Sequence, residues 1–237
     1  MIPWLRAADP ADAFPPVEDA LAEPDGLLCV GGDLSPPRLL AAYRRGIFPW
    51  YSEGQPILWW SPDPRAVLFP QEFKMSRSLA KAVRNRGFTV TCDQDFAGVM
   101  RQCADARLRP EGTWISPDML TAYARLHDLG HAHSVETWLD GHLVGGLYGV
   151  ALDRVFFGES MFSTERDASK VALHRLVEMS LARNVELIDC QVTSAHLESL
   201  GARPIPRSEF VSHLARWITN VNPVTGWPGT SVPGVGK

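Results

Sequence analysis

The sequence predicts a mixed α/β fold in which helices cover a largely antiparallel sheet. Three observations lead to this prediction. From residue 65 onward, strand-like and helix-like segments alternate along the chain. The pair Asp140-Gly141, a strong hairpin-turn signal, joins strand-like segments at His133–Leu139 and His142–Ala151. A segment beginning at Asp167 carries apolar residues at helical spacing, which suits a helix that packs on the sheet.

The first 64 residues differ in composition and are predicted to form a small N-terminal domain. They are rich in proline, glycine and tryptophan. One helix is expected here, with Ser35 as N-cap, Pro36 in the first helical position and an end near Gly46. Ser61–Pro64 is interpreted as a hinge. The larger domain is predicted over residues 65–219, and residues 220–237, rich in proline and glycine, as a loose tail.

The elements of the larger domain follow from caps and apolar patterns. Ser116-Pro117 starts a helix that Gly130 stops, and Asp167 is expected to cap the next long helix. Before the hairpin we expect strand Phe88–Cys92 and helices Phe96–Ala104 and Asp118–Leu129. After it we expect strand Val155–Gly158, the helix after Asp167, buried strand Val185–Ile188, a short helix, and a helix from Ser208 to about Thr219. The helix after Asp167 is expected to pack on the sheet with Val171, Leu173, Leu176, Val177 and Met179.

The composition predicts a soluble, cytoplasmic protein. Hydrophobic residues make up 45% and charged residues 21% of the chain, as in ordinary globular proteins. No apolar run approaches the ~18 residues of a membrane span, and the start has no basic segment followed by an apolar core, so no signal peptide is expected. The 4 cysteines form no CxxC pair and are interpreted as reduced thiols.

A basic stripe interrupts an otherwise acidic chain of net charge −4. Residues 74–86 contain no acidic residue, and a spacing of three and four would align most of their basic residues on one helix face. Two interpretations stay open: a solvated helix face, or a surface that binds nucleic-acid phosphates. The stripe consists of Lys74, Arg77, Lys81, Arg84 and Arg86.

Several other activities find little support in the motifs. The chain has no GxGxxG or P-loop, and the segment nearest to a coenzyme A phosphate loop, at residues 84–89, fails at its last position. Gly158–Phe162 misses the nucleophile elbow of serine hydrolases because Phe162 replaces its second glycine. His127, His131 and His133 lack a metal-binding pattern and are interpreted as surface or capping histidines, so no metal is predicted.

Two carboxylates and an amide are the candidate chemical groups. Glu159 follows one apolar strand and Asp189 follows another, and buried carboxylates are costly unless they have partners or a function. Gln191, two residues after Asp189, would point to the same side if the strand continued. These carboxylates could equally accept hydrogen bonds from backbone amides at strand ends, so both interpretations stay open.

Long motifs between residues 23 and 210 resemble the leucyl/phenylalanyl-tRNA–protein transferase family. The resemblance has two local departures: Phe73-Lys74-Met75 stands where a histidine is expected, and Asp153 takes a turn position that glycine often occupies. The motifs are Glu23–Leu28, Gly46–Ser52, Pro56–Pro62, Gly112–Ile115, Ala132–Glu136, Gly145–Ala151, Phe156–Ser163, Leu187–Gln191 and Ser194–Ala202.

The resemblance implies a fold and an activity. The order of elements resembles the N-acyltransferase (GNAT-like) fold, which acetyltransferases share with aminoacyl-tRNA-dependent transferases. The family transfers leucine or phenylalanine, and less readily methionine, from aminoacyl-tRNA to an N-terminal Arg or Lys, which marks the protein for degradation by the N-end rule pathway. Because the donor is an activated ester, the resemblance implies no ATP, metal, coenzyme A or other cofactor. We expect a monomer.

The resemblance also implies roles for residues. Gln191 would orient the attacking amine, Asp189 would polarise Gln191 or accept the proton, and Glu159 would contact the aminoacyl group or its ribose. Trp50 and Trp114 would stack on the terminal adenine, and the basic stripe would bind the tRNA backbone. The aminoacyl pocket would comprise Leu147, Phe156, Met161, Leu173, Leu176 and Ile188.

Three rival functions remain open from the sequence. One is a coenzyme A-dependent acetyltransferase, which the missing phosphate loop makes less attractive. A second is a tRNA-binding module without catalysis. The third is peptidoglycan bridge synthesis from aminoacyl-tRNA, against which stands the absence of a coiled-coil arm from the sequence.

Overall fold

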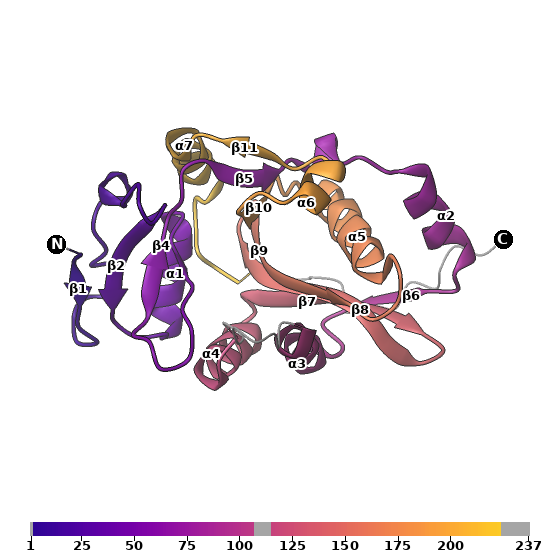
Figure 1. Cartoon of the computed structure of the whole chain (residues 1–237), viewed down its shortest axis with the longest axis horizontal. Helices are drawn as coiled ribbons and strands as arrows, with labels where there is room; N and C mark the ends of the chain where they lie inside the picture. Colours follow the sequence, from indigo (N-terminus) through magenta and orange to yellow (C-terminus); the bar gives the residue numbers. More distant parts are fainter. Residues whose placement is uncertain (1, 107–114, 224–237) are drawn as a thin grey trace.

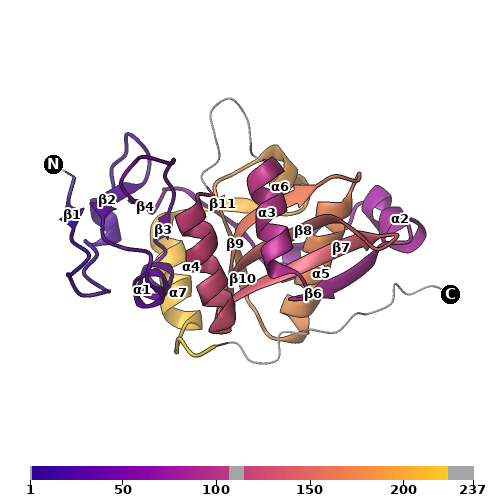
Figure 2. The same ribbon diagram turned by 90° about the horizontal axis from the view of Figure 1, so that it is seen from below.

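The chain folds around two β-sheets (Figures 1 and 2). The structure, a computed structural model, describes residues 2–106 and 115–223. A 4-stranded sheet has the order β1-β2-β4-β3, and a 7-stranded sheet has the order β11-β5-β10-β9-β8-β7-β6. Within the described ranges, no helix is long and apolar enough to cross a membrane. The predicted mixed α/β fold is therefore confirmed.

The small sheet is built from very short strands of the N-terminal region. The predicted helix is present as α1 (Pro36–Arg44). Ser35 precedes it, but its hydroxyl makes no capping bond; its backbone N–H instead donates to Asp33 Oδ1 at 2.8 Å. A 3₁₀ turn at Val17–Asp19 precedes the first long strand. The strands are β1 (Trp4–Leu5), β2 (Leu27–Gly31), β3 (Phe48–Pro49) and β4 (Leu58–Trp60).

In the large sheet, every neighbouring pair except β9 and β10 is antiparallel. The predicted hairpin is present, and Asp140 and Gly141 both have positive φ, as its turn requires. The strands are β5 (Arg65–Leu68), β6 (Thr89–Cys92), β7 (Ala132–Leu139), β8 (His142–Leu152), β9 (Val155–Ser163), β10 (Leu187–Gln191) and β11 (Arg203–Ile205).

Helices cover both faces of the large sheet (Figure 1). α3 (Phe96–Ala106) and α4 (Pro117–Asp128) lie on one face, and α5 (Ala168–Ala182) lies on the other. The expected apolar positions of α5 are all buried. Asp167 does precede α5, but it has a left-handed backbone and makes no side-chain capping bond. The remaining elements are α2 (Arg77–Asn85), a 3₁₀ turn at Pro70–Glu72, α6 (Ala195–Ser199) and α7 (Arg207–Trp217).

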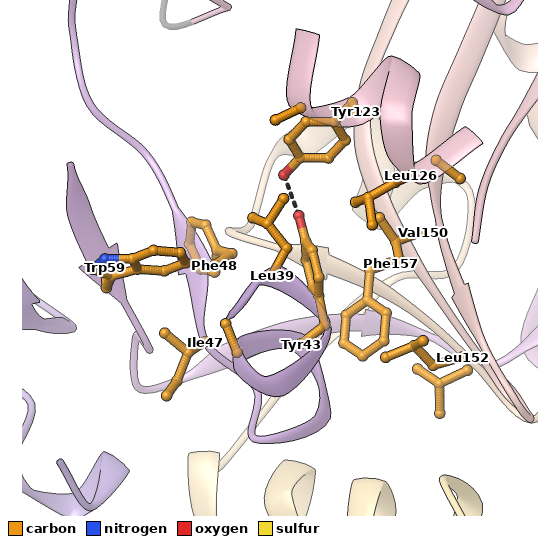
Figure 3. Packing of buried hydrophobic residues seen from close by; sticks show 14 of the residues in the cluster. Leu39, Tyr43, Ile47, Phe48, Trp59, Tyr123, Leu126, Val150, Leu152 and Phe157 are labelled. Carbon is orange, nitrogen blue, oxygen red and sulfur yellow. Dashed lines mark hydrogen bonds between the residues drawn. The ribbon is translucent and has the colours of Figure 1, made fainter. Parts of the chain in front are cut away.

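Of two buried hydrophobic clusters, one contains residues of both sheets and the other surrounds α5. Trp59 and Ile47 of the N-terminal region belong to the same buried cluster as Phe157 and Leu126 of the larger part (Figure 3). The predicted domain boundary between residues 64 and 65 lies between strands of the two sheets, whereas the core crosses it. The domain limits themselves stay predictions, and residues 224–237 of the predicted tail lie outside the described residues.

Candidate active site

A cavity of about 400 Å³ opens between β9 and β10. It has apolar walls and a few polar groups at one side, which is the usual composition of a substrate-binding site. Glu159, Asp189, Gln191 and Trp50 line it. So do all the residues predicted for the aminoacyl pocket, namely Leu147, Phe156, Met161, Leu173, Leu176 and Ile188.

The cavity forms because the two parallel strands separate. Their pairing ends at Phe157 opposite Asp189, while β9 continues along β8 as far as Ser163. Each strand also carries a bulge at this point: Glu159 is the extra residue of β9 against β8, and Cys190 is the extra residue of β10 against β5. Bulges bend a strand and redirect side chains. The polar side chains therefore project at the place where the strands diverge.

Asp189 forms a buried ion pair that the sequence did not reveal. Its Oδ1 accepts from Arg65 Nε at 2.8 Å and its Oδ2 from Arg65 Nη2 at 2.7 Å. Both side chains are almost completely buried, and the guanidinium also lies between the rings of Phe48 and Phe210. A bidentate pair of this kind fixes the carboxylate in both position and orientation.

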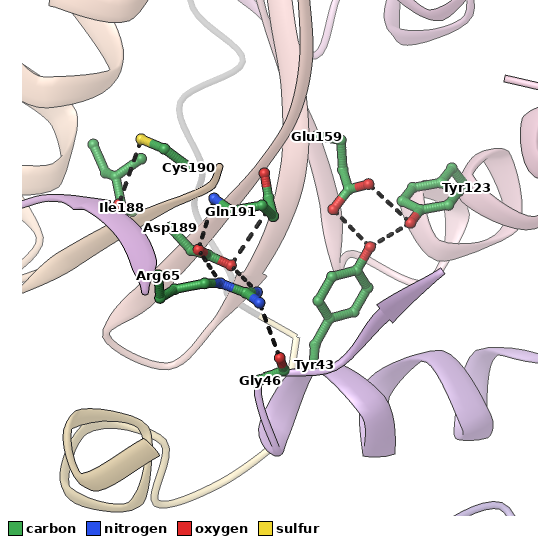
Figure 4. Close-up of polar contacts among 9 residues, drawn as sticks. All are labelled: Tyr43, Gly46, Arg65, Tyr123, Glu159, Ile188, Asp189, Cys190 and Gln191. Atoms are coloured by element: carbon green, nitrogen blue, oxygen red, sulfur yellow. Dashed lines mark hydrogen bonds and ion pairs between the residues drawn. The ribbon is translucent and has the colours of Figure 1, made fainter. Parts of the chain in front are cut away.

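Gln191 is held by the same carboxylate (Figure 4). Its backbone N–H donates to Asp189 Oδ1 at 3.0 Å and its Nε2 donates to Asp189 Oδ2 at 3.4 Å. A carboxylate can only accept from the amide nitrogen, so this contact orients the Gln191 side chain with Oε1 away from Asp189. The backbone of Gln191 is left-handed, with φ of 58°. That conformation is uncommon for residues other than glycine and tends to occur at functional sites.

Glu159 binds two tyrosine hydroxyls (Figure 4). Tyr43 from α1 donates to its Oε1 at 2.6 Å, and Tyr123 from α4 donates to its Oε2 at 3.0 Å. The two hydroxyls also contact each other. Burial raises the pKa of Glu159 from 4.5 to about 7, against the opposing effect of the two hydroxyl donors. Near neutral pH, Glu159 can therefore either accept or release a proton.

Of the two tryptophans predicted to bind adenine, only Trp50 lies within the described residues. Trp50 lines the cavity, has half of its surface exposed, and lies with its ring centroid 5.7 Å from that of Trp60. Trp60 Nε1 donates to the backbone oxygen of Trp50 at 2.6 Å, which fixes the turn that carries the exposed ring. Trp114 lies outside the described residues.

The basic stripe is only partly helical. Arg77, Lys81 and Arg84 lie on α2, and Arg86 is its C-cap. Lys74 was expected on the same helix, but Ser76 caps α2 and Lys74 lies before it, with its backbone N–H donating to Leu200 O at 2.9 Å. Figure 1 shows α2 at the far end of the large sheet from the small sheet, and no residue of α2 lines the cavity.

The three histidines of the sequence analysis have separate environments. The ring of His127 stacks on Phe96, and its Nδ1 lies 2.8 Å from Ala132 O. His133 Nδ1 lies 2.8 Å from Asp93 Oδ2. Burial lowers the pKa of His131, with a contribution from His133. His131 and His133 are buried, so the interpretation as surface histidines was wrong for these two, and none of the three histidines lines the cavity.

Sequence reasoning missed three residues that hold the polar groups: Arg65, Tyr43 and Tyr123. Arg65 ends a tryptophan- and proline-rich segment, and 124 residues separate it from Asp189, so no periodic pattern links the two. The tyrosines lie on the inner faces of helices, where an aromatic residue is indistinguishable from ordinary core. Only the pairing of elements in three dimensions brings these side chains to the carboxylates.

The divergent parallel strands, the apolar cavity and the amide and carboxylates that line it make this cavity the candidate substrate site. A family model described as "Leucyl/phenylalanyl-tRNA protein transferase" matches residues 67–215, and the model of that family's N-terminal domain matches residues 32–63. The chain belongs to the leucyl/phenylalanyl-tRNA protein transferase family.

Individual proteins with this description are similar over nearly the whole chain. A leucyl/phenylalanyl-tRNA–protein transferase of Azoarcus sp. is 58% identical over 98% of this chain and 97% of the relative. A second, from Aromatoleum aromaticum, is 60% identical over 95% of this chain and 94% of the relative. Among solved structures, a GCN5-related N-acetyltransferase from Kribbella flavida has a TM-score of 0.40 and 12% identity, covering 71% of this chain and 60% of that chain.

Proposed function

We propose that this protein is an aminoacyltransferase that moves leucine or phenylalanine, and also methionine, from aminoacyl-tRNA to the N-terminal Arg or Lys of a protein. The product would be a substrate for degradation by the N-end rule pathway. The observation that carries the proposal is the cavity. Its apolar walls suit a side chain that is not branched at the β-carbon, and Gln191, Asp189 and Glu159 line its polar side. Membership of the family supports the same activity.

Donor selection would rest on the apolar walls. Met161 is flexible enough to adapt to leucine, phenylalanine or methionine. Because a single methylene is worth only about 1–3 kcal/mol in such a pocket, rejection of valine and isoleucine must come from shape near the β-carbon. Phe156 and Ile188 lie on β9 and β10 at the point where the strands begin to diverge, and they are well placed for that discrimination.

Amine activation would depend on Gln191. Its Oε1 is left available by the contact of Nε2 with Asp189, and it can accept a hydrogen bond from the attacking α-amine. The hydrogen-bonding positions of Asp189 are occupied by Arg65 and by two groups of Gln191. Of the two roles expected for Asp189, these contacts favour polarising and orienting Gln191 over accepting the proton.

Proton transfer is better matched to Glu159. An α-amine titrates near ~8, and a carboxylate with a pKa of about 7 is close to this value. In this scheme the amine attacks the ester carbonyl, Glu159 or water accepts a proton from nitrogen, and the ribose oxygen leaves with a proton. The ester supplies the driving force, so the reaction requires neither ATP nor coenzyme A, and orientation supplies much of the catalysis.

The test is transfer of labelled phenylalanine from Phe-tRNA to peptides that begin with Arg, Lys or Ala. Wild type is expected to label only the Arg and Lys peptides, and Asp189→Ala and Gln191→Ala to reduce labelling at least tenfold, while exposed Gln71→Ala matches wild type. Retained tRNA binding without transfer to any peptide would instead indicate a binding module. Protection from unfolding by acetyl-coenzyme A would favour an acetyltransferase.

A further inference from the structure

Arg65 contacts the polar side of the cavity from behind. Asp189 and Gln191 line the cavity, whereas Arg65 does not. Its side chain is almost completely buried, with Nε and Nη2 on the two oxygens of Asp189 and Nη1 donating to Gly46 O at 3.2 Å. Burying a guanidinium is costly even when it is paired. No step of the proposed reaction uses Arg65, so its place beside the reacting groups requires a separate explanation.

The donors that face Asp189 occupy both of its oxygens twice (Figure 4). Oδ1 accepts from Arg65 Nε and from the backbone N–H of Gln191, and Oδ2 accepts from Arg65 Nη2 and from Gln191 Nε2. A carboxylate has about four lone-pair sites, so this set is complete. The charge of Arg65 favours Asp189 as an ionised group, which can only accept. The Gln191 amide must therefore turn its nitrogen toward Asp189 and its oxygen away.

Without the guanidinium, the Gln191 amide would lose its fixed direction. The oxygen and nitrogen of a glutamine amide are nearly alike in shape, and half a turn of the group exchanges them. A carboxyl group that carries a proton donates to an amide oxygen as readily as its ionised form accepts from an amide nitrogen. In the reversed orientation Nε2 would face the cavity, and a donor there cannot accept a hydrogen bond from an attacking amine. The direction of the amide thus depends on the charge behind Asp189.

Arg65 is itself held by the small sheet and by α7. The ring centroids of Phe48 and Phe210 lie 4.8 and 4.7 Å from the guanidinium carbon, and Gly46 O accepts from Nη1. Aromatic rings on its faces stabilise the cation and leave the N–H groups at its edge free for the carboxylate. A lysine could supply the charge, but it could not reproduce the planar fork that meets both carboxylate oxygens.

We propose that Arg65 is a positioning residue that fixes the direction of the Gln191 amide, so that Oε1 faces the attacking amine. This inference rests on the proposed function, because the transfer to an amine is what requires an acceptor at this point. Arg65 acts through Asp189 and contacts neither substrate. Its replacement therefore slows the chemical step and leaves substrate binding nearly unchanged.

The experiment is a double-mutant cycle between Arg65→Lys and Gln191→Ala, with transfer from Phe-tRNA to a peptide that begins with Arg. Arg65→Lys alone is expected to lower kcat about tenfold and to change KM for Phe-tRNA by less than about twofold. In the Gln191→Ala background it is expected to cause no further loss, because the amide through which it acts is absent. Arg207→Lys is the matched control, since Arg207 Nη1 binds the backbone oxygen of Ser61 at 2.6 Å and not a carboxylate. This control is expected to keep the wild-type kcat.

Two results of the cycle would overturn the proposal. One is the same loss of kcat in both backgrounds, which is what a purely structural role predicts. The other is a rise in KM with an unchanged kcat. If Arg65→Lys does not fold, Phe210→Leu enters the same cycle, because it keeps the fork and removes one ring from the guanidinium. A loss of about threefold that disappears in the Gln191→Ala background is then expected, and an equal loss in both backgrounds again overturns the proposal.

The side-chain NH₂ resonances of Gln191 test the proposal without turnover. They are assigned by their loss in Gln191→Ala. In wild type they are expected to lie downfield of those of the exposed Gln71 and to exchange more slowly with solvent, because Nε2 donates to a carboxylate. In Arg65→Lys they are expected to move toward those of Gln71, and unmoved resonances would overturn the proposal. Failure of wild type to transfer phenylalanine would instead overturn the proposed function.

Discussion

Replacing Glu159 with glutamine tests the protonation of this half-buried carboxylate. Burial raises the pKa of Glu159 from 4.5 to about 7, so the folded protein holds this proton more tightly than the unfolded chain does. The stability that this supplies is fully present below pH 4.5 and is lost as the pH rises through about 7. The difference between the two pKa values corresponds to about 3 kcal/mol. Above pH 8, the ionised carboxylate is therefore a destabilising group.

A glutamine of the same shape carries no charge, and the hydroxyls of Tyr43 and Tyr123 can still donate to its oxygen or accept from its nitrogen. Glu159→Gln is therefore expected to match wild type near pH 4.5 and to exceed it by up to about 3 kcal/mol at pH 8.5. Transfer activity is expected to fall at the same time, since the variant cannot accept a proton.

The assay is urea unfolding followed by tryptophan fluorescence at pH 5, 7 and 8.5, with the exposed Glu53→Gln as control. The control is expected to follow wild type at every pH. A gain in the free energy of unfolding that is the same at pH 5 and pH 8.5 would refute the argument. A loss of stability at pH 8.5 would refute it as well.

Three further changes have defined outcomes. Asp189→Asn leaves the buried guanidinium of Arg65 without its counter-charge and is expected to cost about 3–5 kcal/mol in urea unfolding, whereas an unchanged midpoint would contradict a buried pair. Tyr123→Phe removes a hydrogen bond that favours ionised Glu159. The apparent pKa of the acid limb in the pH profile of kcat/KM is therefore expected to rise by about one unit. An apparent pKa that is unchanged or lower would contradict this. Leu176→Phe fills the pocket and is expected to reduce transfer of phenylalanine more than that of leucine, by about tenfold in their ratio, and equal losses for both donors would argue against Leu176 as a pocket wall.

The long elements of the larger part could be predicted because each carries its own local signal. Asp140-Gly141 encodes the hairpin, and the apolar spacing of α5 matches the face that it buries. The small sheet had no such signal. Its strands contain as few as 2 residues, and β3 includes Pro49, so neither alternation nor strand propensity could identify them. They are joined through neighbours: β2, which is buried along its whole length, pairs with β1 and β4, and β4 pairs with β3.

For the site, the sequence identified the polar residues on each strand, but it did not identify the residues that contact them from neighbouring elements. Glu159 and Asp189 were recognisable as carboxylates next to apolar strands, yet both lie within their strands and not after them. The bulges that expose them depend on the neighbouring strands β8 and β5. Arg65 could not be paired with Asp189 without knowing that β5 and β10 are adjacent.

The ion pair and the core that crosses between the sheets have a consequence for folding. Arg65 is held by Phe48 of the small sheet and by Phe210 of α7, and Tyr43 of α1 reaches Glu159 from the same region. Because these groups also contact the candidate site, the small sheet and strands β9 and β10 are expected to unfold as one cooperative unit. Hydrogen exchange at the backbone amides of β2 should therefore report the same opening event that admits water to Asp189.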